Sequence, residues 1–344
     1  MRHHPRLNRG LSFDDVLLVP QFSDITSRKS EVDLSVDLGS GVTVSIPIIS
    51  SPMDTVTESG MASTMSDIGG MGIIHRYNSI DEQALLVRKS VASTANIVGA
   101  AVGVTGDYCE RASACVEAGA KVLCVDVAHG HHVLMRDALQ SLRSNFGDSL
   151  HIMAGNVATL DGFNALADWG ATSIRVGIGG GSICSTRIQT GHGIPTLQSV
   201  MNCAMSDRDA SIIADGGIKN SGDIVKALAA GADSVMLGSL LSGTEEAPGE
   251  VMFRGDEKFK AYRGMASIEA QVDWRGHAAS VEGVASVVPY KGSVRRVIQG
   301  LANGIKSGLS YSGCRGVKEI QSKSLFIEQT SAGATESSTH IMRT

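Results

Sequence analysis

A phrase of one pattern occurs four times along the chain: the end of an expected helix, then glycine, then a short apolar run. The four copies are "DIGGMGIIH" (67–75), "EAGAKVLCVD" (117–126), "DWGATSIRVG" (168–177) and "AAGADSVMLG" (229–238). Glycine just past a helix adopts the left-handed conformation that closes the last turn, and an uninterrupted apolar run is typical of a strand buried on both faces. Each phrase therefore predicts a joint from a helix into a parallel strand.

Four further apolar runs have the length of buried strands, namely "IPIIS" (46–50), "IVGAAVG" (97–103), "HIMAG" (151–155) and "SIIADGG" (211–217). Amphipathic stretches separate the runs, for example Asp81 to Ser90 and Val133 to Leu142, and this alternation indicates right-handed crossovers in a parallel sheet. Eight such units over roughly 200–250 residues are typical of a TIM barrel. We therefore predict a single-domain (β/α)8 barrel over residues 46–310, rather than a doubly wound sheet.

The parts of the chain outside the barrel are expected to be small. Residues 1–45 are predicted to form an N-terminal segment that packs on the barrel, and residues 311–344 a C-terminal tail. The stretch from Thr330, "TSAGATESSTHIMRT", is rich in Ser, Thr and Ala. On its own such a stretch is expected to be disordered, and we expect it to order against a neighbouring subunit.

Composition excludes several classes of function. The net charge of -5 gives no basic face for nucleic acid or anionic lipid, so neither is expected as a partner. The chain has no secretory signal and no run of eighteen apolar residues, so we expect a cytoplasmic protein. The six cysteines have no C-x-x-C spacing, which disfavours a zinc knot or a disulfide framework.

The barrel prediction places the chemistry at the carboxyl ends of the strands. Short polar or glycine-rich segments follow six of the expected strands: Ser50 to Asp54, Asp126, Asn156, the loop 177–187, Asp215 to Gly217, and Gly238-Ser239. The glycines at 216, 217 and 238, with Ser182 and Ser239, predict a phosphate site of backbone N–H groups and hydroxyls. Ordinary tight turns into the following helices are the alternative.

The loop "GIGGGSICSTR" (177–187) has four glycines in five positions before one cysteine, Cys184. Because free cysteine is only a few per cent thiolate at neutral pH, oriented N–H groups would have to stabilise a nucleophile there. The alternative for Cys184 is a buried structural thiol. The Asp215 carboxylate suits hydrogen bonds to sugar hydroxyls, and its alternative role is that of a helix N-cap. The adjacent pair His131-His132 lacks a metal-binding pattern.

The assembled motifs resemble the IMP dehydrogenase / GMP reductase family over nearly the whole chain. They are "LSFDDVLLVP" (11–20), "PIISSPMDTVTE" (47–58), "GNVAT" (155–159), "VGIGGGSICSTR" (176–187), "IIADGGIKNSGDIVKALAAGADSVMLGSLLSGTEEAPGE" (212–250), "YRGMAS" (262–267), "EGV" (282–284) and "VPYKG" (288–292). The family's fold is a (β/α)8 barrel and its members are usually tetrameric. The resemblance therefore implies a homotetramer.

The resemblance also implies a chemistry and a set of roles. Cys184 would attack C2 of the purine ring of a nucleoside monophosphate and form a covalent intermediate, while a nicotinamide cofactor exchanges hydride at the same carbon. Thr186 and Glu282 match positions that relay protons. The positions that hold the nucleotide are matched by Ser51, Met53, Ser182, Asp215, Gly217, Gly238, Ser239, Tyr262, Gly264 and Met265. Asp126, Asn156 and Arg175 match the cofactor side, and carbonyls of Gly179, Gly181 and Cys184 match a K+ site.

Two opposite reactions occur in the family, and the flap expected within residues 268–292 discriminates between them. Dehydrogenases oxidise IMP to XMP with NAD and carry an Arg-Tyr pair in the flap that activates water. Here the segment 268–281 reads "IEAQVDWRGHAASV", which is short and has no such pair. This favours the reductase reaction, in which GMP and NADPH give IMP and ammonia. The CBS modules usual in dehydrogenases are also absent from this sequence.

Other segments divide between the two activities. "SRKSEVDL" (27–34), "VDVAHG" (125–130) and "IMAGNV" (152–157) favour the reductase, whereas "SSPMDTVTE" (50–58), "TEEAPGE" (244–250) and residues 279–281 favour the dehydrogenase. An IMP dehydrogenase without CBS modules therefore remains the alternative, with Arg275 as its water-activating base. A purine-nucleotide-binding protein without catalysis is a third hypothesis.

Overall fold

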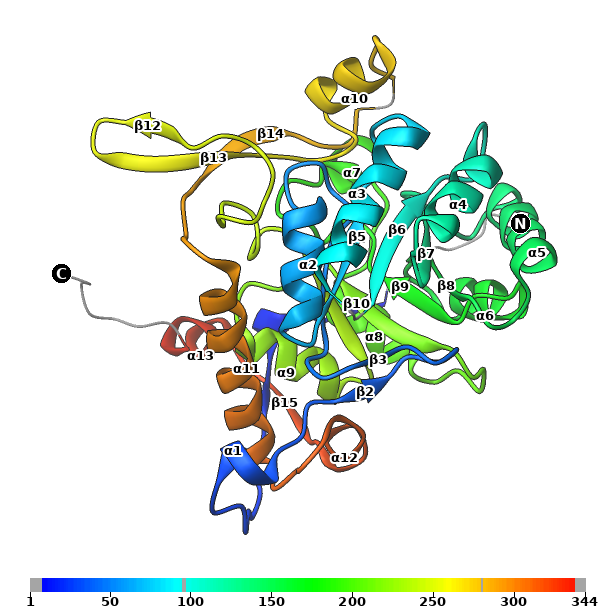
Figure 1. The fold of residues 1–344 in the computed structure, drawn as a ribbon. Coiled ribbons are helices and arrows are strands. Elements are labelled where there is room, and N and C mark those ends of the chain that lie inside the picture. The colour runs from blue at the N-terminus through cyan, green and yellow to red at the C-terminus, as the bar shows by residue number, and fades with distance from the viewer. Residues whose placement is uncertain (1–7, 95–96, 280, 338–344) are drawn as a thin grey trace, which may run out of the picture.

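The computed structural model describes residues 8–94, 97–279 and 281–337. Eight parallel strands close into a barrel in the order β10-β11-β4-β5-β6-β7-β8-β9 (Figure 1). They are β4 (Ile48–Ser50), β5 (Met71–Ile74), β6 (Val98–Val102), β7 (Val122–Asp126), β8 (His151–Val157), β9 (Ser173–Val176), β10 (Ser211–Asp215) and β11 (Ser234–Leu237). The predicted (β/α)8 fold and all eight predicted strands are confirmed.

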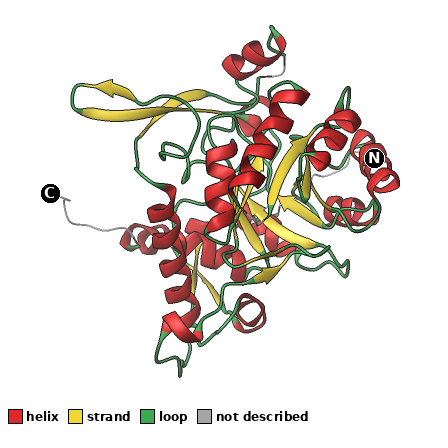
Figure 2. Ribbon diagram, viewed as in Figure 1, coloured by secondary structure: helices red, strands yellow, loops and turns green. Residues whose placement is uncertain are grey.

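Helices cover the outside of the barrel between successive strands (Figure 2). They are α2 (Ser59–Asp67), α3 (Ile80–Ser93), α4 (Tyr108–Glu117), α5 (Val133–Phe146), α6 (Leu160–Asp168), α8 (Thr196–Cys203), α9 (Ser221–Ala229) and α11 (Val294–Tyr311). The glycine that ends each of the four repeated helix-to-strand joints has positive φ, from +90° to +115° at Gly69, Gly119, Gly170 and Gly231. These joints turn the chain from each helix into the next buried strand.

The barrel strands are buried on both faces, and β5, β6, β9 and β11 are buried at every residue. Side chains such as Ile49, Ile73 and Leu123 are fully buried in one continuous core. The core therefore fills the barrel and fixes the positions at which the strands end. In the described residues, none of the helices has the length and apolar character that a membrane span needs.

Segments before and after the barrel pack against it. They comprise the short 3-10 helix η1 (Phe13–Asp15), β1 (Val16–Leu18), α1 (Arg28–Glu31), β2 (Val36–Asp37), β3 (Thr43–Val44), α12 (Val317–Lys323), β15 (Phe326–Glu328) and α13 (Ser331–Glu336). Strand β15 pairs antiparallel with β1, so the two ends of the described chain lie together. Disorder from Thr330 is wrong for residues 331–336, because Thr330 caps α13 through Gly333 N. Residues 338–344 lie outside the described residues.

Three insertions lie at the carboxyl ends of the strands. The short helix α7 (Thr186–Thr190) follows the cysteine loop, and the flap helix α10 (Ile268–Arg275) lies above the barrel. Strands β12 (Met252–Arg254), β13 (Glu257–Arg263) and β14 (Ala285–Pro289) form an antiparallel sheet that projects away from the barrel (Figure 1). The flap thus connects β13 to β14 and returns to the barrel mouth.

Candidate active site

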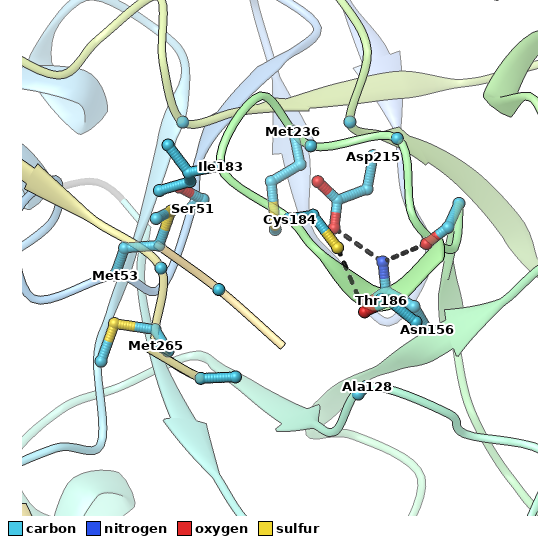
Figure 3. A pocket seen from close by; sticks show the side chains of 18 of the residues that line it. Ser51, Met53, Ala128, Asn156, Ile183, Cys184, Thr186, Asp215, Met236 and Met265 are labelled. Atoms are coloured by element: carbon cyan, nitrogen blue, oxygen red, sulfur yellow. Dashed lines mark hydrogen bonds between the residues drawn. The ribbon is translucent and has the colours of Figure 1, made fainter. Parts of the chain in front are cut away.

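A cavity of about 310 Å³ opens at the carboxyl ends of the barrel strands. The residues predicted from the sequence for nucleotide binding, cofactor binding and cation binding all line this one cavity, as do the predicted catalytic residues Cys184, Thr186 and Glu282. Figure 3 shows Cys184 at its centre, with Ser51, Met53 and Met265 on one side and Asp215, Asn156 and Thr186 on the other. The fold therefore gathers residues from distant parts of the chain around one thiol.

The cysteine loop is held in place by the base of the flap. Cys184 forms a bridge with Gly283, and the backbone N–H groups of Ser185 and Val284 donate to the carbonyls of Glu282 and Ile183 at 2.8 and 3.1 Å. These bonds lie on both sides of Gly283, the residue directly after Glu282. Two segments about a hundred residues apart in sequence thus meet in a short antiparallel ladder, which brings the Glu282 carboxylate to the thiol.

A line of hydrogen bonds joins the three predicted catalytic residues. The Cys184 Sγ–H donates to Thr186 Oγ1 at 3.2 Å, and the Thr186 hydroxyl donates to Glu282 Oε2 at 2.7 Å. All three side chains also line the cavity. A proton can therefore pass between the sulfur and the carboxylate through one hydroxyl, as nucleophilic catalysis by a thiol requires.

The other cysteines lie in different surroundings. All six are free thiols, and burial raises the pKa of Cys115, Cys124 and Cys203 to about 12. Cys184 is half-buried and belongs to the cavity wall. These surroundings disfavour a purely structural role for the Cys184 thiol, because Cys184 lines the cavity and its Sγ–H donates a hydrogen bond to Thr186 Oγ1.

The predicted phosphate loops form a cradle of closely packed backbone. Gly216 and Gly217 have φ of +91° and +79°, and a Cβ at Gly216 would lie 3.1 Å from Gly181 N. A Cβ at Gly238 would lie 3.1 Å from Ser51 Oγ and 3.2 Å from the Tyr262 hydroxyl. Only glycine leaves this space free, and backbone N–H groups of this kind suit an anion.

A lysine supports the cradle from behind. Lys291 Nζ donates to the carbonyls of Ser239 and Leu240 at 2.6 and 3.2 Å, and burial lowers its pKa. The Ser51 residue lies in the wall of the same cavity, and its buried hydroxyl has no hydrogen-bond partner in the part of the chain that the structure describes. A buried hydroxyl without a partner is unfavourable unless a ligand bonds it. The cradle therefore fits a nucleotide.

Arg175 links the residues predicted for the cofactor to one predicted for the substrate. Its guanidinium pairs with Asp126 and, at 2.8 Å, with Asp215 Oδ2, while Asn156 Nδ2 donates to the same Asp215 oxygen at 2.8 Å. Burial disfavours the charge on Arg175, but the two carboxylates outweigh burial and raise its pKa. Asp215 is thus fixed at the cavity. It is not the N-cap of α9, which was its alternative role, because Asn220 caps that helix.

The flap helix α10 does not bring Arg275 to the cavity. Arg275 is exposed, and its guanidinium carbon lies 4.2 Å from the centroid of the Trp274 ring. It is not among the described residues that line the cavity. The role of Arg275 as a water-activating base therefore has no support from its position in this arrangement and stays a prediction of the dehydrogenase alternative. Likewise, His132 is used locally, because its Nδ1 accepts the N–H of Leu134 at the start of α5.

Sequence reasoning missed several residues of the site, chiefly Arg76 and Tyr77, which follow β5. The Arg76 Nη2 donates to the Asp126 carbonyl at 3.3 Å, whereas its Nε is buried without a partner. The signal was present in the sequence, since "HRYN" (75–78) is a polar segment directly after a buried apolar run. The same strand-end argument that selected Asp126 also selects this segment.

Residues 10–340 match the family described as "IMP dehydrogenase / GMP reductase domain". The chain belongs to the IMP dehydrogenase / GMP reductase family. Members of this family are oxidoreductases of purine nucleotides, so the chain is an enzyme of that class. The match covers the barrel, the flap and most of the segments that pack outside the barrel.

Members with both names are similar to this chain. An inosine-5′-monophosphate dehydrogenase from Cryptosporidium parvum is 38% identical, with 97% of this chain and 96% of the relative covered. A GMP reductase from Leishmania major is 33% identical, with 98% of each covered. The solved structure of GMP reductase from Trypanosoma brucei in complex with guanosine 5′-monophosphate has a TM-score of 0.93 at 32% identity, covering 98% of this chain and 99% of that one.

The family relatives differ in length from this chain. The alignment with the Leishmania major reductase spans 481 positions, against 344 residues here, so that relative carries residues with no counterpart in this chain. The alignment with the Cryptosporidium parvum dehydrogenase spans 388 positions. Both activities therefore occur among relatives that match over nearly the whole chain, and overall similarity does not separate them.

Proposed function

We propose that this chain is a GMP reductase, which converts GMP, NADPH and protons into IMP, ammonium and NADP+. The observation that carries the proposal is the hydrogen-bonded line Cys184–Thr186–Glu282 in a cavity with a nucleotide cradle. The described flap residues 268–279 do not line that cavity, so they offer no water-activating side chain there. The solved relative with bound guanosine 5′-monophosphate supports the same substrate.

The residues divide the cavity between two ligands. Ser51, Ser182, Ser239 and the glycines at 217 and 238 would hold the nucleotide phosphate, and Asp215 its ribose hydroxyls. Met53, Tyr262, Gly264 and Met265 would enclose the rest of the nucleotide. Asp126, Asn156 and Arg175 would hold the nicotinamide end of the cofactor. The unpartnered Arg76 Nε fits this assignment, because it is a buried donor at the edge next to Asp126.

Cys184 would form a bond from Sγ to C2 of GMP, with its proton passing to Thr186 Oγ1 and then to Glu282. The same line returns a proton to the 2-amino group, which leaves as ammonia while Cys184 stays bonded to C2. The reduced nicotinamide supplies the two electrons and the hydrogen that C2 gains. Departure of the sulfur as a thiolate then gives IMP. Glu282, which has taken up a proton from solvent after giving the first one to the ammonia, reprotonates Cys184 through Thr186 Oγ1. No step of this sequence needs an activated water.

An IMP dehydrogenase remains the second candidate, because several relatives with that name are 33–38% identical over nearly the whole chain. That reaction ends in hydrolysis and needs a base that activates water at C2. Arg275, the base that the sequence offered, is exposed and is not among the described residues that line the cavity. The reductase is therefore the better explanation of the flap.

The absorbance of the reduced nicotinamide separates the candidates in one assay. With GMP and NADPH we expect absorbance to fall, and with IMP and NAD we expect no rise. A rise only in the second mixture would instead establish the dehydrogenase. No change in either mixture, together with GMP binding by calorimetry, would leave a nucleotide-binding protein without catalysis.

The proposal also includes K+, a homotetramer and a cytoplasmic location. The carbonyls of Gly179, Gly181 and Cys184 are expected to hold K+, although the Gly181 carbonyl already accepts the N–H of Cys184 at 3.1 Å. A carbonyl oxygen has a second lone pair available for a cation. Replacing K+ with Li+ in the assay is expected to lower the rate, and light scattering measures the subunit number.

A further inference from the structure

Near its carboxyl end, the flap helix α10 carries an aromatic side chain, Trp274, that contacts the barrel. Trp274 packs against Tyr77 with ring centroids 4.4 Å apart, and the guanidinium of Arg76 lies 5.3 Å from the Tyr77 ring and 5.5 Å from the Trp274 ring. We call Arg76, Tyr77 and Trp274 the flap stack. Arg76 and Tyr77 follow β5, so the stack joins the flap to the barrel.

The flap stack lies in the wall between two cavities. Arg76 and Tyr77 line the active-site cavity, while Tyr77 and Trp274 line a second cavity of about 920 Å³ between α3 and the flap. Trp274 is therefore not in the wall of the active-site cavity itself. Any influence that it has on the reaction must pass through Arg76, Tyr77 or the flap backbone.

Arg76 is constrained on several sides, and its buried Nε has no hydrogen-bond partner among the described residues. Its Nη2 donates to the carbonyl of Asp126, and a Cβ on Gly103 would lie 3.4 Å from its Nη1. The two rings cover another part of the guanidinium, and Nε is buried without a partner. The stack thus holds a positive charge at the edge of the cavity that we assign to the dinucleotide.

Other contacts hold α10 without reaching Arg76. Gln271 bonds the Ala266 carbonyl at 3.1 Å and the Ala279 N–H at 2.9 Å, which ties the two ends of the flap together. Asp273 pairs at 2.5 Å with Arg263, which also pairs with Asp54. These contacts hold the helix on the segments that lead into and out of the flap. Trp274 is the side chain of α10 that joins it to the cofactor side.

We propose that Trp274 is a positioning residue, which holds the flap and the Arg76 guanidinium in one arrangement so that dinucleotide binding and flap position are coupled. This inference rests on the proposed function for the identity of the dinucleotide. Toward the barrel, the Trp274 ring makes one aromatic pair with Tyr77 and one cation–π contact with Arg76, apart from its cation–π contact with Arg275 on the flap. Contacts of these two kinds together correspond to a change of about tenfold in an equilibrium. Coupling of this kind is reciprocal between the two sites.

The first test compares Trp274→Ala with Trp274→Phe, which keeps an aromatic ring. For the alanine variant we expect the Kd and KM for the dinucleotide to rise about tenfold, with kcat and GMP affinity within about twofold. Trypsin is expected to cut after the exposed Arg275 about tenfold faster. The phenylalanine variant should recover most of each effect. Unchanged dinucleotide affinity and unchanged cleavage of the alanine variant would overturn the inference.

The second test leaves Trp274 intact and is independent of how well its variants fold. The chain has two tryptophans, so Trp169→Phe makes Trp274 the only one. We expect NADP+ with GMP to change the emission of Trp274 and to reduce its quenching by acrylamide, while GMP alone does neither. NADP+ is used because the reduced form would absorb the emission. Unchanged Trp274 emission at saturating NADP+ would overturn the coupling.

Equilibrium dialysis of NADP+ against the unaltered protein separates this inference from the proposed function. Binding of NADP+ that leaves Trp274 unaffected would refute the role of Trp274 and leave the proposed activity intact. Absence of NADP+ binding, with or without GMP, would refute the proposed cofactor and with it the coupling.

Discussion

Buried polar side chains have different surroundings at the two ends of the barrel. At the amino ends of the strands, His151 donates from Nδ1 to the Gly39 carbonyl at 3.0 Å and accepts the Ser173 hydroxyl at 2.7 Å. Arg143 bonds the carbonyls of Gly147, Leu150 and Gly170 and the hydroxyl of Thr172. Both ring nitrogens of His151 and all three guanidinium nitrogens of Arg143 have protein partners.

At the carboxyl ends, by contrast, Ser51 Oγ and Arg76 Nε are buried without partners. Such atoms also occur elsewhere, since Ser199 and Ser234 have unpartnered hydroxyls, so one orphaned atom does not mark a site. The difference is that Ser51 and Arg76 lie in one cavity with the glycine cradle and Cys184. At the amino ends His151 and Arg143 are satisfied by the protein, although the Ser234 hydroxyl at the start of β11 has no partner among the described residues. At the carboxyl ends the unpartnered Ser51 and Arg76 atoms lie in one cavity, where we expect a ligand to bond them.

The largest expected effect comes from the carboxyl end. Cys184→Ser should lower turnover of GMP by more than about a thousandfold, because it removes the thiol that bonds C2. GMP binding measured by calorimetry should change little, since the cradle is untouched. Substantial residual turnover would exclude the covalent mechanism.

Filling the cradle tests whether its empty space serves the ligand. Gly238→Ala places a methyl group against Ser51, Met53 and Tyr262, at 3.1 to 3.2 Å, and should weaken GMP binding by roughly a hundredfold. Gly300→Ala is the matched control, because nothing lies within 4 Å of its Cβ position. Equal GMP affinity in the two variants would show that Gly238 does not face the nucleotide.

The amino end should determine stability at acidic pH and have no role in turnover. Burial lowers the pKa of His151 in the folded protein to about 4. When the pH is below the ordinary pKa of histidine, His151 therefore binds a proton more readily in the unfolded chain than in the folded one. The neutral histidine therefore supports folding fully above that ordinary value, and this support is lost as the pH falls toward 4. Between pH 8 and pH 5 the loss is about 2 kcal/mol.

The variant His151→Gln isolates this contribution. Its free energy of unfolding, from urea titrations at several pH values, should fall less steeply with acid than that of the unaltered protein. Parallel pH profiles would refute a buried neutral imidazole at this position.

The smallest effect is expected at the outside of the flap. Arg275→Ala removes one exposed cation–π contact and should change kcat/KM for GMP by about twofold at most. A loss of a hundredfold or more would place Arg275 at the reacting atoms and revive the dehydrogenase alternative.

The sequence predicted the barrel because its repeated glycine joints and apolar runs state where helices end and buried strands begin. It also predicted the lining of the cavity, since strand ends meet at one edge and the family resemblance assigned residues to them. The contacts of Arg175 with both Asp126 and Asp215 were not predictable, because they depend on how strands β7, β9 and β10 are placed around the barrel.

The flap stack was beyond sequence reasoning for a similar reason. Tyr77 and Trp274 are far apart in the chain, and neither lies in a pattern that indicates a contact. The helix α13 was missed because composition alone indicated disorder, whereas Thr330 caps the helix and Gln329 donates to the carbonyls of Asp14 and Asp15. Local composition does not report partners from the other end of the chain.

The pairing of β1 with β15 has a consequence for synthesis of the chain. Val16 lies opposite Glu328, so β1 gains its partner only after the whole barrel between the two strands has been synthesised. During translation β1 presents an unpaired edge, which is a site for association with other nascent chains. Folding in the cell should therefore be sensitive to truncation at Phe326 or earlier, well away from any catalytic group.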